Sequence, residues 1–190
     1  MRWLYIHGFN SSSQSGKAQE TKRYLAAHGR ETDWLCPDLS HYPSQAIEQL
    51  TTLMKQCAEP PVLIGSSLGG FYATVLVARF NLKAVLINPA VTPSQLLKPA
   101  LNTLQKSWYG DSTYFFTQTH LNELLALELS APLYPDNILM MQEKGDEVLD
   151  WTQAAHYYRD CHQLIFNGGD HGFTRYRMVL GLIEQFFNIN

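Results

Sequence analysis

Residues 62–71 of this chain read Val-Leu-Ile-Gly-Ser-Ser-Leu-Gly-Gly-Phe. The first three form a continuously apolar run, which is typical of a strand buried on both faces of a sheet. The residues from Gly69 to Phe80 have the apolar spacing of a helix. Between strand and helix, Gly65 to Gly69 match G-x-S-x-G, the pattern that holds a serine on a tight strand-to-helix turn. The stretch therefore predicts an α/β fold, with Ser67 as the candidate nucleophile.

This turn has two other interpretations. A phosphate-binding loop also follows a strand and opens a helix, and Gly65 and Gly70 have the spacing of its two glycines. Phe71 stands where that loop needs its lysine, and the dinucleotide pattern G-x-G-x-x-G does not match either. A tight turn without chemistry remains as the alternative to the nucleophile.

Outward from this stretch, short apolar runs alternate with helical patterns along the chain. Strands are expected at 3–6, 34–36, 62–64, 84–87, 138–141 and 164–166, and helices at 17–28, 43–57, 69–80, 151–161 and 175–187. This alternation predicts a mostly parallel sheet of five to six strands with helices on both faces. We expect a single domain over residues 1–190, with an irregular and helical cap insertion at residues 91–134, where the alternation is lost.

Composition and charge narrow the class of function. The chain has 190 residues, of which 45% are hydrophobic, and 14 Lys and Arg against 17 Asp and Glu give a net charge of −3. Nucleic acids and anionic membranes both require a concentrated basic surface, so neither is expected as a partner. A small-molecule substrate is expected instead.

The cysteines and the apolar segments indicate the compartment. Cys36, Cys57 and Cys161 are odd in number and lack C-x-x-C spacing, which argues against a zinc site or a disulfide framework and favours buried thiols. The apolar stretch at residues 3–6 is too short for a signal peptide, and no longer run approaches a membrane span. A cytoplasmic protein without a bound metal is the expectation.

A serine nucleophile needs N–H donors for the developing oxyanion and a histidine base. The N–H of Leu68, next to the nucleophile, is one candidate donor. The loop His7-Gly8-Phe9-Asn10 follows the first strand, which makes the N–H of Phe9 the second candidate and gives His7 a structural role. A plain β-turn is the alternative interpretation of this loop.

Among seven histidines, His171 is the candidate base. It lies in the glycine-rich stretch Asn167-Gly168-Gly169-Asp170-His171-Gly172-Phe173, between an expected strand and the last helix. Such a loop can present an imidazole at the carboxyl edge of a parallel sheet, in the chain order Ser…Asp…His of known hydrolases. The alternative is that this stretch only makes a turn.

The carboxylate that orients the base should follow the strand at 138–141. Asp146 is the first choice, because it lies in the turn directly beyond that strand. Asp150 is the rival, although it is also a suitable N-cap for the next helix. Glu147 is expected to be solvated.

Five stretches together resemble a known family. They are Leu-Tyr-Ile-His-Gly-Phe-Asn-Ser-Ser at 4–12, Ile-Gly-Ser-Ser-Leu-Gly-Gly-Phe-Tyr-Ala-Thr at 64–74, Asn-Pro-Ala-Val-Thr-Pro at 88–93, Gly-Asp-Glu-Val-Leu-Asp at 145–150 and Gly-Gly-Asp-His-Gly-Phe at 168–173. In this order they are similar to the YqiA-like esterases, small bacterial members of the α/β-hydrolase superfamily. The resemblance implies an α/β-hydrolase fold and a cytoplasmic carboxylic-ester or thioester hydrolase with no cofactor.

The resemblance also supports Ser67, Asp146 and His171 as nucleophile, acid and base of an esterase that forms an acyl-enzyme. Asn88-Pro89-Ala90 is expected to shape the pocket, and the aromatic residues between Trp108 and Phe116 to line an acyl pocket or to pack. Two alternatives remain: a non-catalytic binding protein on a hydrolase fold, and an acyltransferase that uses the same triad.

Overall fold

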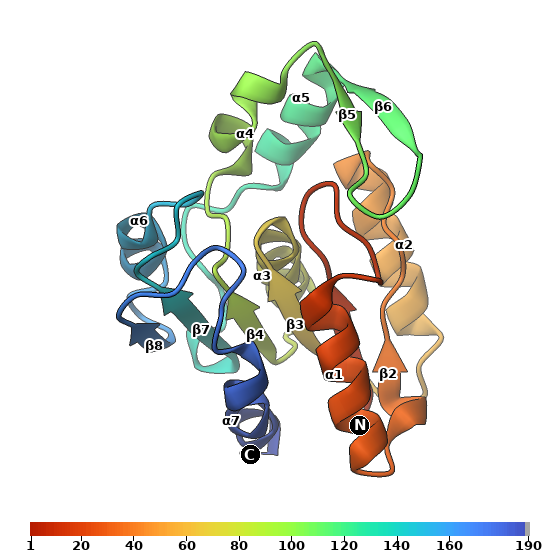
Figure 1. The fold of residues 1–190 in the computed structure, drawn as a ribbon, viewed down its shortest axis with the longest axis vertical. Coiled ribbons are helices and arrows are strands. Elements are labelled where there is room, and N and C mark those ends of the chain that lie inside the picture. Colours follow the sequence, from red (N-terminus) through yellow and green to blue (C-terminus); the bar gives the residue numbers. More distant parts are fainter. Residues whose placement is uncertain (189–190) are drawn as a thin grey trace.

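The computed structural model describes residues 1–188. Its main sheet is formed by β1 (Trp3–Ile6), β2 (Trp34–Leu35), β3 (Val62–Ser66), β4 (Ala84–Ile87), β7 (Ile138–Glu143) and β8 (His162–Phe166). Within the described residues, the order is β2-β1-β3-β4-β7-β8 and every neighbouring pair is parallel (Figure 1). The prediction of a mostly parallel sheet of five to six strands is confirmed.

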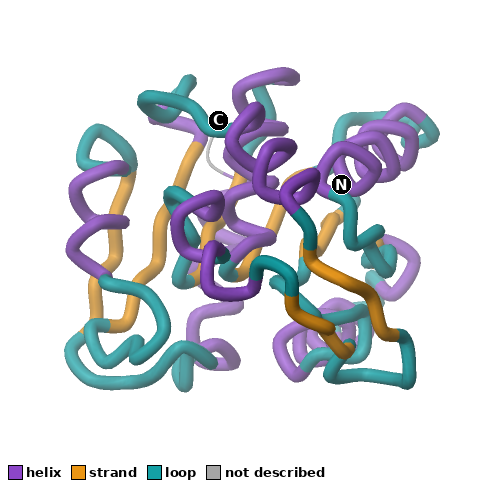
Figure 2. Tube along the Cα trace, turned by 90° about the horizontal axis from the view of Figure 1, so that it is seen from above, coloured by secondary structure: helices purple, strands orange, loops and turns teal. Residues whose placement is uncertain are grey.

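Helices cover both faces of this sheet (Figure 2). They are α1 (Gly16–Ala27), α2 (Pro43–Lys55), α3 (Leu68–Phe80), α6 (Trp151–Tyr157) and α7 (Tyr176–Asn188), and a short 3-10 turn (Glu31–Asp33) precedes β2. The core on one face contains α1 and α7, and the core on the other contains α2, α3 and α6. The helix bounds predicted from apolar spacing are correct to within a few residues.

The strands are apolar throughout because both of their faces are buried. In β1, Trp3 and Tyr5 pack in the core with α1 and α7, whereas Leu4 and Ile6 pack in the core with α2 and α3. Side chains alternate between the two faces of a strand, so a strand covered on both sides needs apolar residues at every position.

The strand order determines where two loops meet. The chain leaves β1 for β2 on one side and then returns to place β3 on the other side of β1. Loops diverge at such a switch point and leave a crevice at the carboxyl ends of the strands, where ligands bind in open α/β sheets. Ile6 pairs with Gly65, so the loop after β1 lies directly beside the turn that holds Ser67.

The segment at residues 91–134 contains helices and also an antiparallel hairpin that its sequence did not predict. After α4 (Pro93–Leu96) and a 3-10 turn (Lys98–Ala100), β5 (Thr103–Lys106) and β6 (Thr113–Phe116) form an antiparallel hairpin. Helix α5 (Gln118–Leu127) and another 3-10 turn (Pro135–Asn137) then lead back to β7. Together α4, the hairpin and α5 lie at one end of the molecule (Figure 1). We call residues 91–134 the cap segment.

The three cysteines are free thiols, but they are half-buried rather than fully buried. Burial raises the pKa of Cys36 to about 12 and that of Cys161 to about 11, so neither is a thiolate near neutral pH. No helix within residues 1–188 is long and apolar enough to cross a membrane.

Candidate active site

Ser67 lies on a strained turn between β3 and α3. Its backbone has φ of 55° and ψ of −120°, a conformation that non-glycine residues rarely adopt. Its N–H donates to Ile87 O at 3.0 Å, which ties the turn to β4. A Cβ at Gly65 would overlap the backbone of Gly69, and a Cβ at Gly69 would overlap the carbonyl of Ile6. The two glycines of the pattern are thus required by close backbone packing.

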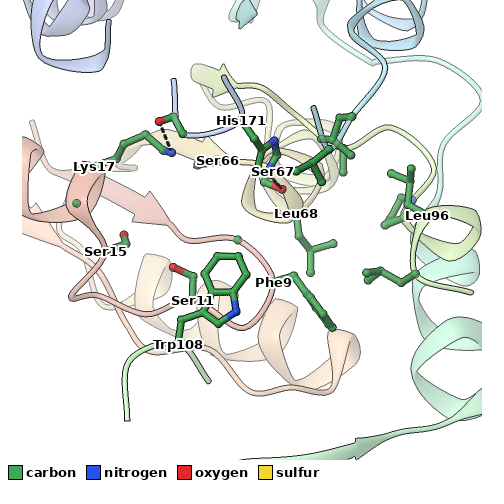
Figure 3. Close-up of a pocket in the computed structure, with 18 of the residues that line it drawn as sticks. Phe9, Ser11, Ser15, Lys17, Ser66, Ser67, Leu68, Leu96, Trp108 and His171 are labelled. Atoms are coloured by element: carbon green, nitrogen blue, oxygen red, sulfur yellow. Dashed lines mark hydrogen bonds between the residues drawn. The ribbon is translucent and has the colours of Figure 1, made fainter. Parts of the chain in front are cut away.

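One chain of hydrogen bonds joins Ser67, His171 and Asp146. The Ser67 hydroxyl lies 3.1 Å from His171 Nε2 (Figure 3). On the other side of the ring, His171 Nδ1 lies 2.9 Å from Asp146 Oδ2. Because a carboxylate only accepts, Nδ1–H donates to Asp146 and Nε2 is left to accept from the serine. The Asp146 side chain is fully buried, whereas that of His171 is 20% exposed. The structure therefore brings together three residues from the ends of β3, β7 and β8.

The turn after β7 keeps Asp146 ionised. Its Oδ1 accepts from the N–H groups of Val148 and Leu149 at 2.9 and 2.8 Å. Burial acts to raise the pKa of Asp146, but the hydrogen bonds from His171 and these two amides outweigh it and lower the pKa below its usual value. A carboxylate in this state can orient an imidazole over the whole neutral pH range.

The two neighbouring acids have different positions. Asp150 is exposed and caps α6 by accepting from the N–H of Thr152 at 2.9 Å, and it has no contact with His171. Glu147 is exposed as expected, but it is not only solvated, because its Oε2 accepts from the N–H of His171 at 3.0 Å. Of the three candidate acids, Asp146 is the one hydrogen-bonded to the imidazole.

The loop after β1 approaches Ser67 closely. A Cβ at Gly8 would lie 3.2 Å from Ser67 Cβ, so glycine allows the approach. Within residues 1–188, neither the N–H of Phe9 nor that of Leu68 donates to another protein group. His7 is buried; its Nδ1–H donates to Gly8 O at 3.0 Å and its Nε2 accepts from Leu39 N–H at 3.1 Å. Burial lowers the pKa of His7, and the neutral ring braces the loop.

The hairpin of the cap segment is attached to this loop through Asn10. The N–H of Trp108 donates to Asn10 O at 2.9 Å, Tyr114 donates its hydroxyl proton to Asn10 Oδ1 at 2.8 Å, and Asn10 Nδ2 donates to Gln105 at 2.9 Å. Asn10 has a positive φ of 54°, which asparagine tolerates better than most residues. The cap segment and the loop at residues 7–10 are thus one hydrogen-bonded unit.

A cavity of about 630 Å³ opens above Ser67, within the usual size range of small-ligand pockets. Its apolar wall includes Leu68, Ala90, Leu96, Leu97, Trp108 and Leu149. Figure 3 shows Ser67 and His171 between Leu96 on one side and Lys17 on the other. Lys17 donates to Gly172 O at 2.8 Å, and burial lowers its pKa, opposed by the charges of Asp170 and Asp146.

Some aromatic residues of the cap segment line the cavity and others pack elsewhere. Trp108 and Tyr109 line the cavity, and Trp108 is 71% exposed there. Phe116 is buried in the core and stacks on the buried ring of His120. Phe115 is exposed. Within the described part of the chain, no three His, Cys, Asp or Glu side chains are grouped so that they could hold a metal ion.

Two residues beside the triad were not recognised from the sequence. The stretch Asn88-Pro89-Ala90 is expected from the sequence to shape the pocket, and Ala90 lines it, whereas Asn88 is fully buried and donates hydrogen bonds to the loop of His171. Glu143, at the end of β7, is also fully buried and accepts hydrogen bonds from the same loop. The available signal was a glutamate that ends a run of buried strand residues, where a charge requires partners.

Comparison with protein families identifies the chain. The model of UPF0227, described as an uncharacterised protein family, matches residues 2–188. The chain belongs to the UPF0227 family. The resemblance to the YqiA-like family is thereby confirmed. A UPF0227 protein of Shewanella woodyi is 32% identical over 94 residues, which are 47% of this chain and 51% of that relative. The chain spans about half the length of the curated UPF0227 relatives it matches.

Solved structures share the fold at low sequence identity. Alpha/beta hydrolase domain-containing protein 10 from mouse superposes with a TM-score of 0.71 and 16% identity, over 96% of this chain and 88% of that chain. The esterase domain of a Rhodothermus marinus protein superposes with a TM-score of 0.69 and 17% identity, over 97% of this chain and 85% of that chain. This member of UPF0227 therefore has the α/β-hydrolase fold that the resemblance implied.

Proposed function

We propose that the protein is a serine esterase that hydrolyses small carboxylic esters or acyl thioesters through an acyl-enzyme intermediate. The observation that carries the proposal is the hydrogen-bond chain Ser67–His171–Asp146 on a strained strand-to-helix turn, beside an apolar cavity. A non-catalytic binding protein has no use for a strained serine turn or for a buried carboxylate paired with an imidazole. The likeness to an esterase domain of known structure is consistent with this function.

In the first step, Ser67 Oγ attacks the carbonyl carbon of the ester and its proton passes to His171 Nε2. Asp146 holds the Nδ1–H tautomer and stabilises the imidazolium that forms. The tetrahedral intermediate collapses when the bond to the alcohol or thiol breaks, and the leaving group takes the proton from Nε2. The acyl group then remains as an ester on Ser67.

In the second step, water attacks the acyl-enzyme and gives its proton to Nε2. Collapse of this intermediate breaks the bond to Oγ, which recovers its proton from His171 and releases the acid. In both steps we assign the oxyanion to the N–H groups of Phe9 and Leu68. Each such donor is worth roughly 3 kcal/mol of barrier in comparable enzymes.

The pocket favours an uncharged, apolar acyl group. Leu96, Leu97 and Leu149 form an apolar wall, although Glu147 also lines the cavity, and Lys17 lies on the far side of Ser67. Burial of an acyl chain against that wall contributes roughly 0.8 kcal/mol for each methylene group. Esters with a few apolar carbons are therefore expected to react faster than acetate esters.

A fluorophosphonate probe tests the proposal directly. Mass spectrometry is expected to find one covalent adduct on Ser67 in the wild-type protein and none in the Ser67→Ala variant. A panel of nitrophenyl esters and acyl thioesters of rising chain length then measures kcat/KM. Absence of the adduct and of ester turnover would sink the proposal. Labelling with slow hydrolysis but fast transfer to an added alcohol or amine would instead favour an acyltransferase.

A further inference from the structure

The loop that carries His171 is held by a buried carboxylate outside the triad. Glu143 Oε2 accepts from the N–H of Asp170 at 2.9 Å and from the N–H of Thr174 at 3.0 Å. Its Oε1 accepts from the guanidinium of Arg175 at 2.7 Å and from the Thr174 hydroxyl at 3.0 Å. Glu143 is thus fully buried and still bonded on both oxygens. These bonds flank His171 on both sides in the chain.

A second buried side chain holds the same loop from the neighbouring strand. Asn88, directly after β4, donates from Nδ2 to the carbonyl of Asp170 at 2.9 Å and to that of His171 at 3.2 Å. Its Oδ1 accepts from the N–H of Glu143 at 2.9 Å. Asn88 has a φ of 42°, a left-handed conformation that asparagine adopts more readily than most residues. Asn88 and Glu143 therefore act on the loop as a connected pair.

Together these contacts provide hydrogen-bond partners for the backbone N–H and C=O groups of Asp170 and His171. Asp170 N–H bonds to Glu143, both carbonyls bond to Asn88, and His171 N–H bonds to Glu147. Side chains, rather than a helix or a strand, hold this part of the backbone.

The loop is also shaped to fit the carboxylate. Gly169 has a φ of 78°, and a Cβ there would overlap the carboxylate of Glu143. Burial acts to raise the pKa of Glu143. The hydrogen bonds from the Asp170 backbone, the Arg175 side chain, and the backbone and side chain of Thr174 outweigh burial, so the pKa is lowered. The group is a buried anion, and its hydrogen bonds to charged and backbone donors are of the stronger kind.

We propose that Glu143 and Asn88 are positioning residues that hold His171 Nε2 over Ser67 Oγ. Neither residue touches the reacting atoms, so both act through the imidazole. The proposal rests on the proposed esterase function and deepens it. A displacement of about 1 Å at a catalytic group costs on the order of 100-fold in rate, so such anchoring is expected to appear in kcat.

Glu143→Gln is the first test. The amide keeps the shape of the side chain, but its NH₂ group must replace one of the two oxygens. In one orientation it faces the N–H groups of Asp170 and Thr174, and in the other it faces the guanidinium of Arg175, so donors face donors in both. We expect kcat for a nitrophenyl ester to fall about 100-fold with KM nearly unchanged. Glu184→Gln is the matched control, since Glu184 lies on α7, pairs with Arg30 and has no contact with the loop. We expect it to lower Tm without changing kcat.

A double-mutant cycle separates positioning from a general loss of structure. If Glu143 acts through the imidazole, Glu143→Gln is expected to have no further effect on kcat in a His171→Ala background. Equal fold-losses in the two backgrounds would overturn the proposal. If Glu143→Gln fails to fold, the same cycle is run with Asn88→Asp, which tolerates the left-handed backbone but lacks the Nδ2 donor.

A spectroscopic measurement keeps this proposal distinct from the esterase proposal. The proton between His171 Nδ1 and Asp146 should give a downfield NMR signal in the wild type, which Glu143→Gln should weaken or remove. A signal that is unchanged in both the Glu143→Gln and the Asn88→Asp variants would overturn the positioning role, whatever the substrate. Failure of the wild type to react with a fluorophosphonate would count against the esterase function alone.

Discussion

The turn that holds Ser67 and the loop that holds His171 are built in different ways. The serine turn is held by backbone: a hydrogen bond to Ile87 O, and glycines where two backbones touch. The histidine loop is held by the side chains of Glu143 and Asn88, which reach it from two strands. The first requires a short, recognisable sequence. The second requires residues that are distant in the chain.

The two regions are expected to differ in how easily a change of pH or the loss of one contact alters their conformation. Backbone packing at Gly65 and Gly69 involves no ionisable group, so we expect the conformation of the serine turn not to depend on pH. The histidine loop is instead held by the ionised carboxylate of buried Glu143 and by the hydrogen bonds of the Asn88 side-chain amide. We therefore expect the position of the His171 imidazole to be more easily perturbed than that of the Ser67 hydroxyl.

Ser67→Ala removes the chemistry of the serine turn without removing its glycines. Loss of the nucleophile is expected to lower kcat by about 10⁶. Steady-state kinetics with a nitrophenyl ester measures the effect, and Ser130→Ala, an exposed serine beyond α5, is the control. Turnover near the wild-type rate in Ser67→Ala would refute its role as nucleophile.

Asp146→Asn breaks the contact that joins the histidine loop to the turn after β7. An amide in place of the carboxylate no longer enforces the Nδ1–H tautomer, so kcat is expected to fall by about 10⁴. Asp150→Asn, which alters a helix cap on the same loop, is expected to leave kcat unchanged. If Asp150→Asn were the more damaging variant in the same assay, the assignment of the two acids would be reversed.

Acid titration tests the histidine loop, because the buried carboxylate of Glu143 accepts hydrogen bonds from it. The pKa of Glu143 is lowered in the folded state relative to an unfolded value of about 4.3, so the folded state favours the ionised form. The stabilisation is complete above the unfolded pKa and is lost as the pH falls through the folded pKa. The difference in Tm between wild type and Glu143→Gln should therefore shrink from pH 6 to pH 3 in thermal scans. A constant difference would contradict this ionisation.

Trp108→Ala is the smallest test, because it changes the pocket mouth and neither of the two regions. Trp108 is 71% exposed, so its loss is expected to lower kcat/KM for an octanoate ester by about threefold to tenfold. The value for an acetate ester, which does not reach the mouth, should not change. Met178→Ala, on the exposed side of α7, is the control. Equal losses for both esters would place Trp108 outside the acyl path.

The turn of Ser67 was predicted from the sequence, whereas the hairpin of the cap segment was not. G-x-S-x-G beside an apolar run predicted the turn of Ser67, since strand, turn and helix are contiguous. The hairpin at β5 and β6 was not predicted, because its strands are short, largely exposed and without a clear apolar alternation. It is stabilised instead by contacts to Asn10, about a hundred residues earlier in the chain.

By itself, the sequence determined the parallel sheet, the positions of its strands and of the helices that cover it, and the candidates Ser67 and His171. These depend on periodicity and on turn residues, which act over a few positions. Only the tertiary structure decided that Asp146 and not Asp150 meets His171, and that Asn88 and Glu143 form hydrogen bonds with the loop of His171. The choice between two acids four residues apart depends on which side chain the turn directs inward, and the bond between Asn88 and Glu143 spans 55 residues. Contacts of this kind are created by the packing of strands, so no local pattern encodes them.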